Sequence, residues 1–562
     1  MADTRATFRP GTAAALAALA FAVYANTLRN GFVYDDLAQI VANPWLQAWS
    51  FLPEILANHP GGFNPDFLPL YYRPWMNLSF LATRQVLGPD PWGFHLVNVL
   101  WHVAAVVLAY AASVELVRRL DAGLPGWCPA AAAAIFAVHP AGSEAVAWNC
   151  GVTDLTVTVF GLATVVLYLR DRRLAAAIAF ASALLAKETA VVLPVFLAVV
   201  EGISPRREPR PLRRLLPFAV VLLAYLPVRL WALGGLAPGR ETFPTGGAPW
   251  LVTAAELLAR YLVKLAWPHP LNALSALEAV PSIVSVRAAL ALAAVLAFAA
   301  IVYAARRRPL LVAAATLVAL PLLPVLVVRP AGSAIFADRY LYLPALGFGL
   351  ALAALAGRAP APFRWALAAL VLTLGTVTVA RNAVWKDGVT LWTDTASKSP
   401  RSAIAWEFLC QAHAASGRYA EAIASCGRAV ELDAERLDAR INLGNALAVA
   451  GRLDEAAGRF LEALRKAPHS ADAWKGLGYA YARAGRALEA VEAYRAALRE
   501  RPEFPEARND LGLILHELGE TAEAEAQLRE AVRLRPDVPL YADNLAKVLT
   551  PKPAPESSPP PP

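Results

Sequence analysis

The sequence predicts an all-α protein, in which a membrane domain of about eleven spanning helices precedes an array of paired helices. The chain has 562 residues, of which 57% are hydrophobic and 17% are charged. Its mean hydropathy of +0.44 is seldom reached by soluble domains of this length. Charge in residues 1–382 is confined to short clusters, whereas residues 403–550 repeat every 34 residues. We expect residues 383–402 to connect the two domains and the Pro-rich residues 551–562 to form a disordered tail.

The basic residues of the membrane domain lie between its apolar runs. Short loops rich in Arg and Lys mark the cytoplasmic side of a membrane protein. Four such clusters occur: "RRLD" from Arg118, "RDRR" from Arg170, "PRREPRPLRR" from Pro205 and "RRR" from Arg306. They account for the formal net charge of +8 without any nucleic-acid-binding motif, so we expect no nucleic-acid partner.

Apolar runs of about 18 residues or more are long enough to cross a bilayer. Combined with the basic clusters, they predict eleven crossings. Because eleven is odd, the N-terminus is expected in the cytoplasm and the repeats on the opposite side of the membrane. The expected crossings are 12–29, 94–117, 128–145, 152–169, two short helices within 174–203, 213–234, 285–305, 309–328, 340–357 and 363–381.

The first apolar run, 12–29, has two interpretations. It follows Arg5 and Arg9, as the apolar region of a signal peptide would. Its length suits a spanning helix, however, and "NTLRNGF" is a poor cleavage site. We therefore expect an uncleaved first helix.

Two other stretches depart from a simple crossing. Residues 174–203 have basic clusters on both sides, so we expect two short helices that meet near the outer face at "AKET". Residues 250–267 carry Glu256, Arg260 and Lys264 at a spacing of four, which forms one polar stripe on an apolar helix. Such a helix suits the membrane interface better than a crossing.

The C-terminal part repeats with a period of 34 residues. Its pattern is similar to the tetratricopeptide repeat, in which small residues let two antiparallel helices approach, Gly turns the chain and Pro ends the unit. We expect four repeats and a capping helix, with a protein partner on the concave face. The residues in phase are Gly417, Gly451, Gly485 and Gly519, then Gly444, Gly478 and Gly512, then Pro468, Pro502 and Pro536, with Trp406 and Trp474 at the aromatic position.

Two of the four cysteines, Cys410 and Cys426, fall on the two helices of the first repeat. A disulfide would form there if the repeats lie in an oxidising periplasm. The alternative is that they are two small core residues. No metal-ligand spacing occurs among the four cysteines.

The predicted topology collects acids and bases from distant segments on the outer side. Ionisable groups at membrane depth are costly and tend to mark function. The outer segments contribute Asp35 and Asp36, Arg73, His95, His139, Glu144, Asp154, Lys187 and Glu188, His269, and Asp338 with Arg339.

This combination suits one kind of chemistry. A carboxylate beside a second acid can act as a general base. Arg and Lys suit a phosphate anion, the former as a bidentate fork and the latter as a point charge. Together they predict proton abstraction from a hydroxyl acceptor while a lipid phosphate leaves, with fixed cations stabilising the departing charge.

Several motifs, in order along nearly the whole chain, resemble one family. They are "NGFVYDD", "YRPWMNLSF", "GFHLVNVLWH", "FAVHPAGSEAVAW" with "GVTDL", "LLAKE" and "ADRYLYLP", followed by the repeats. They are similar to the transmembrane and tetratricopeptide-repeat O-mannosyltransferases, which are membrane glycosyltransferases of the GT-C fold. The resemblance implies a lipid-phosphate sugar donor, dolichyl-phosphate mannose in eukaryotes, and transfer to Ser or Thr of a protein outside the cytoplasm.

The resemblance also assigns roles to the outer residues. It implies that Asp35 is the catalytic base with Asp36 as its partner, and that Lys187 and Arg339 contact the donor phosphate. The residues assigned to acceptor contact or loop positioning are Arg73, His95, His139, Glu144, Asp154 and Glu188.

The sequence departs from the family in two respects. "GVTDL" has Thr153 where the family usually has an Arg before its Asp. The high content of Ala, Arg and Pro suggests a bacterium, which would use undecaprenyl rather than dolichyl carriers and would place the protein in its inner membrane. A divalent cation is a conceivable cofactor, given the number of acids.

Six of the site residues also have a structural alternative. The tryptophans are expected to form an interfacial belt. Asp35 and Asp36 could simply end a helix and face water, and His139 could be a helix-end residue. Lys187 could extend to the interface and pair with Glu188. Arg339 could form a local salt bridge with Asp338, and Arg73 could anchor a loop.

Two other functions compete with protein O-glycosylation. One is a transferase that decorates a glycan or lipid, with the repeats recruiting an envelope assembly. The other is a membrane-anchored scaffold without catalysis. A scaffold needs one or two spans, and it does not need acids and bases matched across distant loops.

Overall fold

The computed structural model describes residues 6–59, 61–63, 71–121, 123–205, 211–235, 248–275, 282, 284–327, 336–536 and 538–550. The chain divides into two compact units, Met1–Lys398 and Ser399–Pro562. Every regular element in these ranges is a helix, and one isolated bridge pairs Ser275 with Phe336. The predicted all-α class is confirmed. The expected tail at 551–562 lies outside the described residues.

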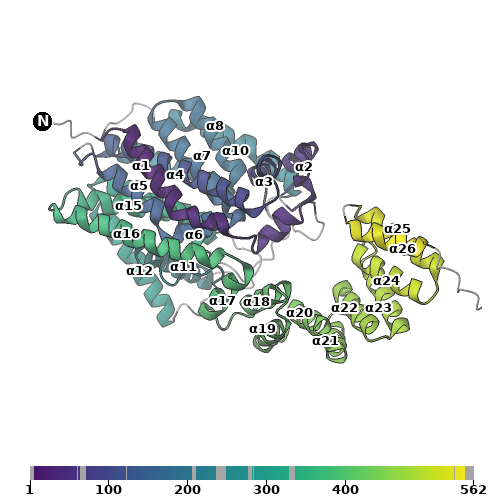
Figure 1. Ribbon diagram of the computed structural model, residues 1–562. Helices are drawn as coiled ribbons and strands as arrows, with labels where there is room; N and C mark the ends of the chain where they lie inside the picture. Colours follow the sequence, from purple (N-terminus) through teal and green to yellow (C-terminus); the bar gives the residue numbers. More distant parts are fainter. Residues whose placement is uncertain are drawn as a thin grey trace, which may run out of the picture. The chain divides into compact units, whose positions relative to one another are not determined.

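The first unit is a bundle in which α5 packs among α1, α4, α15 and α16 (Figure 1). Its helices are α1 Pro10–Tyr24, α2 Leu52–Ala57, α3 Pro74–Leu87, α4 Pro91–Leu120, α5 Cys128–Val138, α6 Ser143–Ala147, α7 Val152–Leu169, α8 Arg173–Ala186, α9 Leu193–Ile203, α10 Pro211–Leu233, α11 Ala248–Ala266, α12 Val286–Ala304, α13 Pro309–Ala319, α14 Leu323–Val327, α15 Tyr342–Ala356, α16 Pro362–Asn382 and α17 Gly388–Lys398.

This unit carries the helices of a multi-pass membrane protein. Eight helices in the described ranges are long and apolar enough to cross a membrane, and a pair bent by 51°, Cys128–Val138 with Pro140–Ala147, makes nine. They coincide with nine of the eleven expected crossings. The other two fall on α8 and α9, which have 14 and 11 residues and are joined by a short turn at Glu188–Val192. Helix α11 is not among the nine, as its charged stripe predicts.

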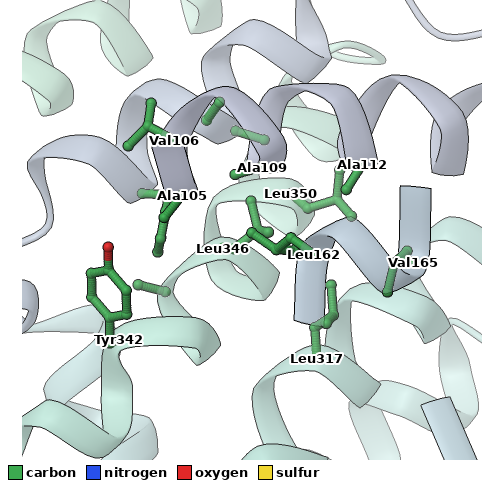
Figure 2. Close-up of a cluster of buried hydrophobic side chains, with 14 of the residues drawn as sticks. Ala105, Val106, Ala109, Ala112, Leu162, Val165, Leu317, Tyr342, Leu346 and Leu350 are labelled. Carbon is green, nitrogen blue, oxygen red and sulfur yellow. The ribbon is translucent and has the colours of Figure 1, made fainter. Parts of the chain in front are cut away.

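Small residues allow the helices of this unit to pack closely. Figure 2 shows Ala105, Ala109 and Ala112 of α4 against larger side chains of neighbouring helices, including Leu162 of α7 and Leu346 of α15. Lipid tails are as apolar as leucine, so close packing rather than water exclusion holds such helices together. Alanine at the contact faces therefore contributes to stability by shortening the distance between backbones.

Helix α15 packs closely against two neighbouring helices. A methyl group at Gly347 would lie 2.6 Å from the carbonyl oxygen of Ala314 on α13, and one at Gly349 would lie 2.7 Å from that of Ala132 on α5. Only glycine fits at both positions. The two contacts fix α15 between α13 and α5, and with it the turn Asp338–Leu341 that precedes the helix.

The second unit is a row of antiparallel helix pairs. Its helices are α18 Ala403–Ala415, α19 Tyr419–Leu432, α20 Leu437–Val449, α21 Leu453–Lys466, α22 Ala471–Arg483, α23 Ala487–Glu500, α24 Pro505–Glu517, α25 Thr521–Leu534 and α26 Pro539–Leu549. The four in-phase glycines from Gly417 to Gly519 all have positive φ, between 72° and 86°, where they end the first helix of each pair. The described residues of this unit thus form four helix pairs, followed by the single helix α26.

The aromatic position of the repeat has a specific hydrogen-bonding role. Trp474 Nε1 donates to the carbonyl of Pro468 at 2.8 Å, and Trp406 Nε1 donates to Pro400 at 3.1 Å. In the fourth repeat Arg508 replaces the tryptophan and donates from Nη2 to Pro502 at 2.8 Å. In three of the four repeats this position thus carries a long side chain whose N–H donates to the carbonyl six residues earlier.

Of the two alternatives for Cys410 and Cys426, a disulfide or two small core residues, the structure has the disulfide. Cys410 on α18 and Cys426 on α19 form a disulfide, with Cα atoms 5.2 Å apart. Cys128 and Cys150 are buried free thiols in the first unit. Residues 383–402 were expected to connect the domains. Those up to Lys398 belong to the first unit and include helix α17.

Candidate functional site

The loop that follows α1 is fastened to a distant loop by the carboxylate of Asp36. This side chain is fully buried and accepts three hydrogen bonds. The donors are Val33 N at 3.2 Å within the same turn, and Asn149 Nδ2 at 3.1 Å and Cys150 N at 3.0 Å across the site. Burial raises the pKa of Asp36 to about 7, and these donors oppose the rise because they favour the ionised form.

The second loop, residues 139–151, is held rigidly between α5 and α7. Asn98 of α4 donates from Nδ2 to the carbonyl of Trp148 at 2.9 Å. Gly151 packs so tightly that an added methyl group would lie 2.3 Å from the carbonyl oxygen of Ala145. The ring of His95, which is also buried, lies 3.4 Å from both the Gly31 carbonyl and Asn149 Nδ2. His95 therefore supports the contact between the two loops.

Asp35 has the opposite environment to its neighbour. Its side chain is exposed, and it forms no hydrogen bond or ion pair with any other described residue. The surrounding protein still removes part of its hydration, and this desolvation raises the pKa of Asp35 to about 6. The positive charge of Arg339 acts in the other direction. Asp35 is thus an accessible carboxylate whose pKa is raised above that of an ordinary aspartate.

A residue with a strained backbone precedes the two aspartates. Tyr34 has φ of 55°, a left-handed conformation that costs a residue with a side chain on the order of 1–3 kcal/mol. Its ring is packed 5.8 Å from Trp148 and 5.2 Å from Trp392, which holds the turn in place. The turn leaves Asp36 in the interior and Asp35 at the surface.

Arg339 faces the same region from the turn before α15. Its guanidinium pairs with the carboxylate of Glu144, which also accepts from the Arg339 backbone N–H at 3.0 Å. The guanidinium lies 5.2 Å from the rings of both Trp148 and Tyr340. Its side chain is 24% exposed, compared with 4% for Glu144. The arginine is therefore fixed in direction and still accessible.

Two further ion pairs come from the segment between α8 and α9. Lys187 Nζ lies 2.5 Å from Asp154 Oδ1, and both side chains are buried. Arg73 forms a bidentate pair with Glu188, with Nη2 to Oε1 at 2.6 Å and Nε to Oε2 at 3.0 Å. Lys187, Asp154 and Arg339 line one small pocket together. We call Asp35, Asp36, Glu144, Asp154, Lys187 and Arg339 the loop cluster.

The structure thus places most of the predicted site residues near one another, in pairs that the sequence did not specify. Glu188 pairs with Arg73 and not with Lys187, and Arg339 pairs with Glu144 and not with Asp338. His139 stays apart from the other predicted residues: its Nε2 lies 3.0 Å from the Leu265 carbonyl, and its Nδ1 accepts from Ala141 N at 3.3 Å.

Several residues of the site were not predicted. Asn149 and Asn98 join the loops, and Trp148 lies between Tyr34 and Arg339. Asparagine within an otherwise apolar stretch was the available signal. Arg229, which is not part of the loop cluster, is a charged residue inside the span Arg213–Leu233, and charged residues at membrane depth tend to mark function. Lys264, assigned to the polar stripe of α11, pairs with Asp338 at 2.5 Å.

The described part of the site lacks the ligand set of a metal centre. No group of three or more His, Cys, Asp or Glu side chains within the described ranges is placed to hold an ion. Two buried polar atoms of the site, Asp154 Oδ2 and Trp148 Nε1, lack a hydrogen-bond partner there. Such atoms are uncommon in folded proteins and call for a water or a ligand.

Comparison with known proteins agrees with the resemblance seen in the motifs. The chain is 37% identical over 221 residues to protein O-mannosyl-transferase Tmtc2 of Drosophila melanogaster, covering 35% of this chain and 22% of that protein. It is 36% identical over 206 residues to Tmtc1 of the same organism, covering 34% and 23%. For human TMTC2 the values are 33% over 161 residues, covering 27% and 18%.

The chain is similar to the transmembrane and tetratricopeptide-repeat O-mannosyltransferases. The similarity spans about a fifth of the length of each of these relatives. A tetratricopeptide repeat model matches residues 381–436, 441–503 and 484–539. The resemblance of the chain to these O-mannosyltransferases and the nature of its repeats are therefore confirmed.

Solved structures resemble the repeats. MamA is 23% identical with a TM-score of 0.24, over 26% of this chain and 87% of that chain. YrrB, described as a TPR protein with an unusual peptide-binding site, is 22% identical with a TM-score of 0.24, over 28% and 81%.

The tight packing of Gly151 generates a testable expectation. Substituting Gly151→Ala forces the second loop to move, because backbone atoms occupy the space that the methyl group needs. We expect a lower melting temperature of the purified protein and loss of the contact with Asp36. Gly202→Ala is the matched control, since nothing lies within 4 Å of an added methyl group there. Equal melting temperatures for the two variants would show that the second loop is not rigid.

Proposed function

We propose that this protein is a membrane glycosyltransferase that moves a sugar, with mannose as the first candidate, from a polyprenyl-phosphate donor to a hydroxyl group of an exported protein. One observation carries the proposal: Asp35 is accessible and unpaired among the described residues, and it lies in the field of Arg339. The relatives named O-mannosyl-transferases support the same reaction class.

The reaction divides between the two charges. Asp35 accepts the proton of a Ser or Thr hydroxyl as its oxygen forms a bond to the anomeric carbon of the sugar. The bond between that carbon and the donor phosphate oxygen breaks, and the electron pair leaves with the polyprenyl phosphate. Arg339 stabilises the phosphate charge, and a guanidinium suits this role because it offers two parallel N–H donors.

The surrounding ion pairs determine which cation is accessible to the donor phosphate. Arg339 is more accessible than Lys187, whose side chain is 4% exposed and already bound to Asp154. We infer that Arg339 contacts the phosphate directly, and that Lys187 adds positive potential from within the pocket that they share. The Arg73–Glu188 pair holds the loops around the site, as do His95 and Asp36.

The repeats are proposed to recruit the acceptor protein on their concave face. We place the protein in a bacterial inner membrane, with the N-terminus in the cytoplasm and the repeats in the periplasm. The four basic clusters support this orientation. The disulfide of the first repeat supports it as well, because disulfides persist in the periplasm and are rare in the cytosol.

The proposed base is tested by Asp35→Asn, which preserves shape and removes the ability to accept the proton. We expect the rate of sugar transfer to fall by roughly 100-fold or more. The melting temperature should not fall, because Asp35 has no partner to lose among the described residues.

The readout is mass spectrometry of a purified acceptor incubated with polyprenyl-phosphate mannose. Glu54→Gln is a charge-matched control on α2. If Asp35→Asn transfers sugar at the normal rate, Asp35 is not the catalytic base. If the wild type modifies no acceptor while its repeats still bind envelope proteins, the scaffold alternative takes precedence.

The pH dependence of transfer follows from the pKa of Asp35. A base works in its ionised form, and the pKa is raised to about 6, so the rate should increase as the pH rises through about 6. The measurement is single-turnover transfer at a series of pH values, with the melting temperature recorded at each. A transfer rate that is constant across this range while the protein stays folded would contradict the assignment.

A further inference from the structure

A groove of about 490 Å³ lies among α11, α12, α13 and α15, away from the loop cluster. Its walls include Phe298 and Val302 of α12, Ala315 of α13, and Ala351 and Leu355 of α15. Every other lining residue is also apolar, with one exception, Arg308. We call this cavity the α12 groove.

The α12 groove lies at membrane depth. Three of its four helices, α12, α13 and α15, belong to candidate spans. The outer surface of α12 carries exposed apolar side chains such as Leu290, Leu292 and Leu296, as expected for a helix that faces lipid. An apolar cavity bordering lipid is filled more favourably by hydrocarbon than by water.

Arg308 gives one end of the groove a charge. It caps the start of α13 and is exposed, and it forms no ion pair with any other residue in the described ranges. Its neighbour Arg306 is held differently, 4.0 Å from the Tyr303 ring and with Nη1 donating to the Tyr303 carbonyl at 3.0 Å. The groove therefore combines an apolar interior with a free cation at one end, which is complementary to an anionic lipid.

The loop cluster lies at the other ends of the same helices. Arg339 and Pro321 line its pocket, at the start of α15 and beyond the end of α13. Leu355 and Arg308 line the α12 groove, at the end of α15 and the start of α13. The 15 residues of α15 separate the two ends by roughly 22 Å. A lipid phosphate held at Arg339 would therefore leave Arg308 unpaired.

We propose that the α12 groove binds an acyl chain of an anionic membrane phospholipid, whose phosphate is held by Arg308. The guanidinium of Arg308 forms charge-assisted hydrogen bonds to the phosphate. The acyl chain runs between α12 and α15 toward Phe298 and Phe348. The lipid fills the space between two helices that are otherwise loosely joined, and it is distinct from the sugar donor.

The test is native mass spectrometry of the full-length protein, purified in an equimolar mixture of phosphatidylglycerol and phosphatidylethanolamine with identical chains. The wild type should retain phosphatidylglycerol in preference to phosphatidylethanolamine. Ala351→Trp fills the groove and should remove the retained lipid. Arg308→Gln should keep the groove but lower the preference for phosphatidylglycerol about tenfold, because a charge-assisted contact is lost.

Two matched controls and three outcomes make the test decisive. Leu290→Trp, on the lipid-facing side of α12, and Arg306→Gln, outside the groove, should both behave as the wild type. Unchanged retention in Ala351→Trp would overturn the proposal. So would an equal loss of preference in Arg306→Gln and Arg308→Gln, since that indicates general surface charge. The proposal would also be overturned if Ala351→Trp keeps phosphatidylglycerol but no longer binds polyprenyl-phosphate mannose. In that case the groove holds the tail of the sugar donor.

Discussion

The contact between the Asp36 carboxylate and the second loop is the interaction on which the candidate site depends. A buried carboxylate is tolerated only when its oxygens are satisfied, and here three N–H donors satisfy them. Two of the donors belong to residues more than a hundred positions away in the sequence. The contact brings the loop that carries Asp35 against the loop that carries Glu144, and Glu144 in turn fixes Arg339. The base and the cation thus have their relative positions set by one anchoring acid.

The membrane unit contains two groups of charges with different characters. At the end that carries the basic clusters, Glu201 of α9 is surrounded by Arg119 at 2.7 Å, Arg214 at 2.9 Å and the Tyr168 hydroxyl at 3.0 Å. These contacts join four helix ends and leave Glu201 buried. The loop cluster differs because it includes a carboxylate with no partner of its own among the described residues. Glu201 is occupied by its partners, whereas an accessible, unpaired acid is available for chemistry.

Much of the fold could be predicted from the sequence because periodic patterns determine it. The apolar runs predicted the spans, and the glycines spaced 34 residues apart predicted the repeat turns, where they have positive φ. The two short helices α8 and α9 were predicted from the basic clusters on both sides of 174–203, whereas the bend after Val138 was not predicted within the expected crossing 128–145. Local sequence was sufficient for the spans, the repeat turns and the two short helices.

The site could be predicted only as a set of residues. The two aspartates are adjacent in sequence, and nothing local indicates that one is buried and the other exposed. That difference comes from the left-handed turn at Tyr34 and from Asn149 and Cys150, which meet Asp36 only in three dimensions. The partners of Arg73 and Arg339 could not be predicted either, because each could pair with several acids and the packing of distant loops decides which.

The central claim is that Asp36 joins the two loops, and amide hydrogen exchange measures this directly. The account predicts slow exchange in the segments 30–41 and 145–152 of the wild type. Substitution of Asp36→Asn removes the charge of the side chain that accepts hydrogen bonds from both segments. Hydrogen exchange should therefore accelerate in both segments together. It should remain slow in Asp35→Asn. If Asp36→Asn leaves the exchange of residues 145–152 unchanged, the two loops do not depend on this carboxylate, and the proposed arrangement of base and cation is wrong.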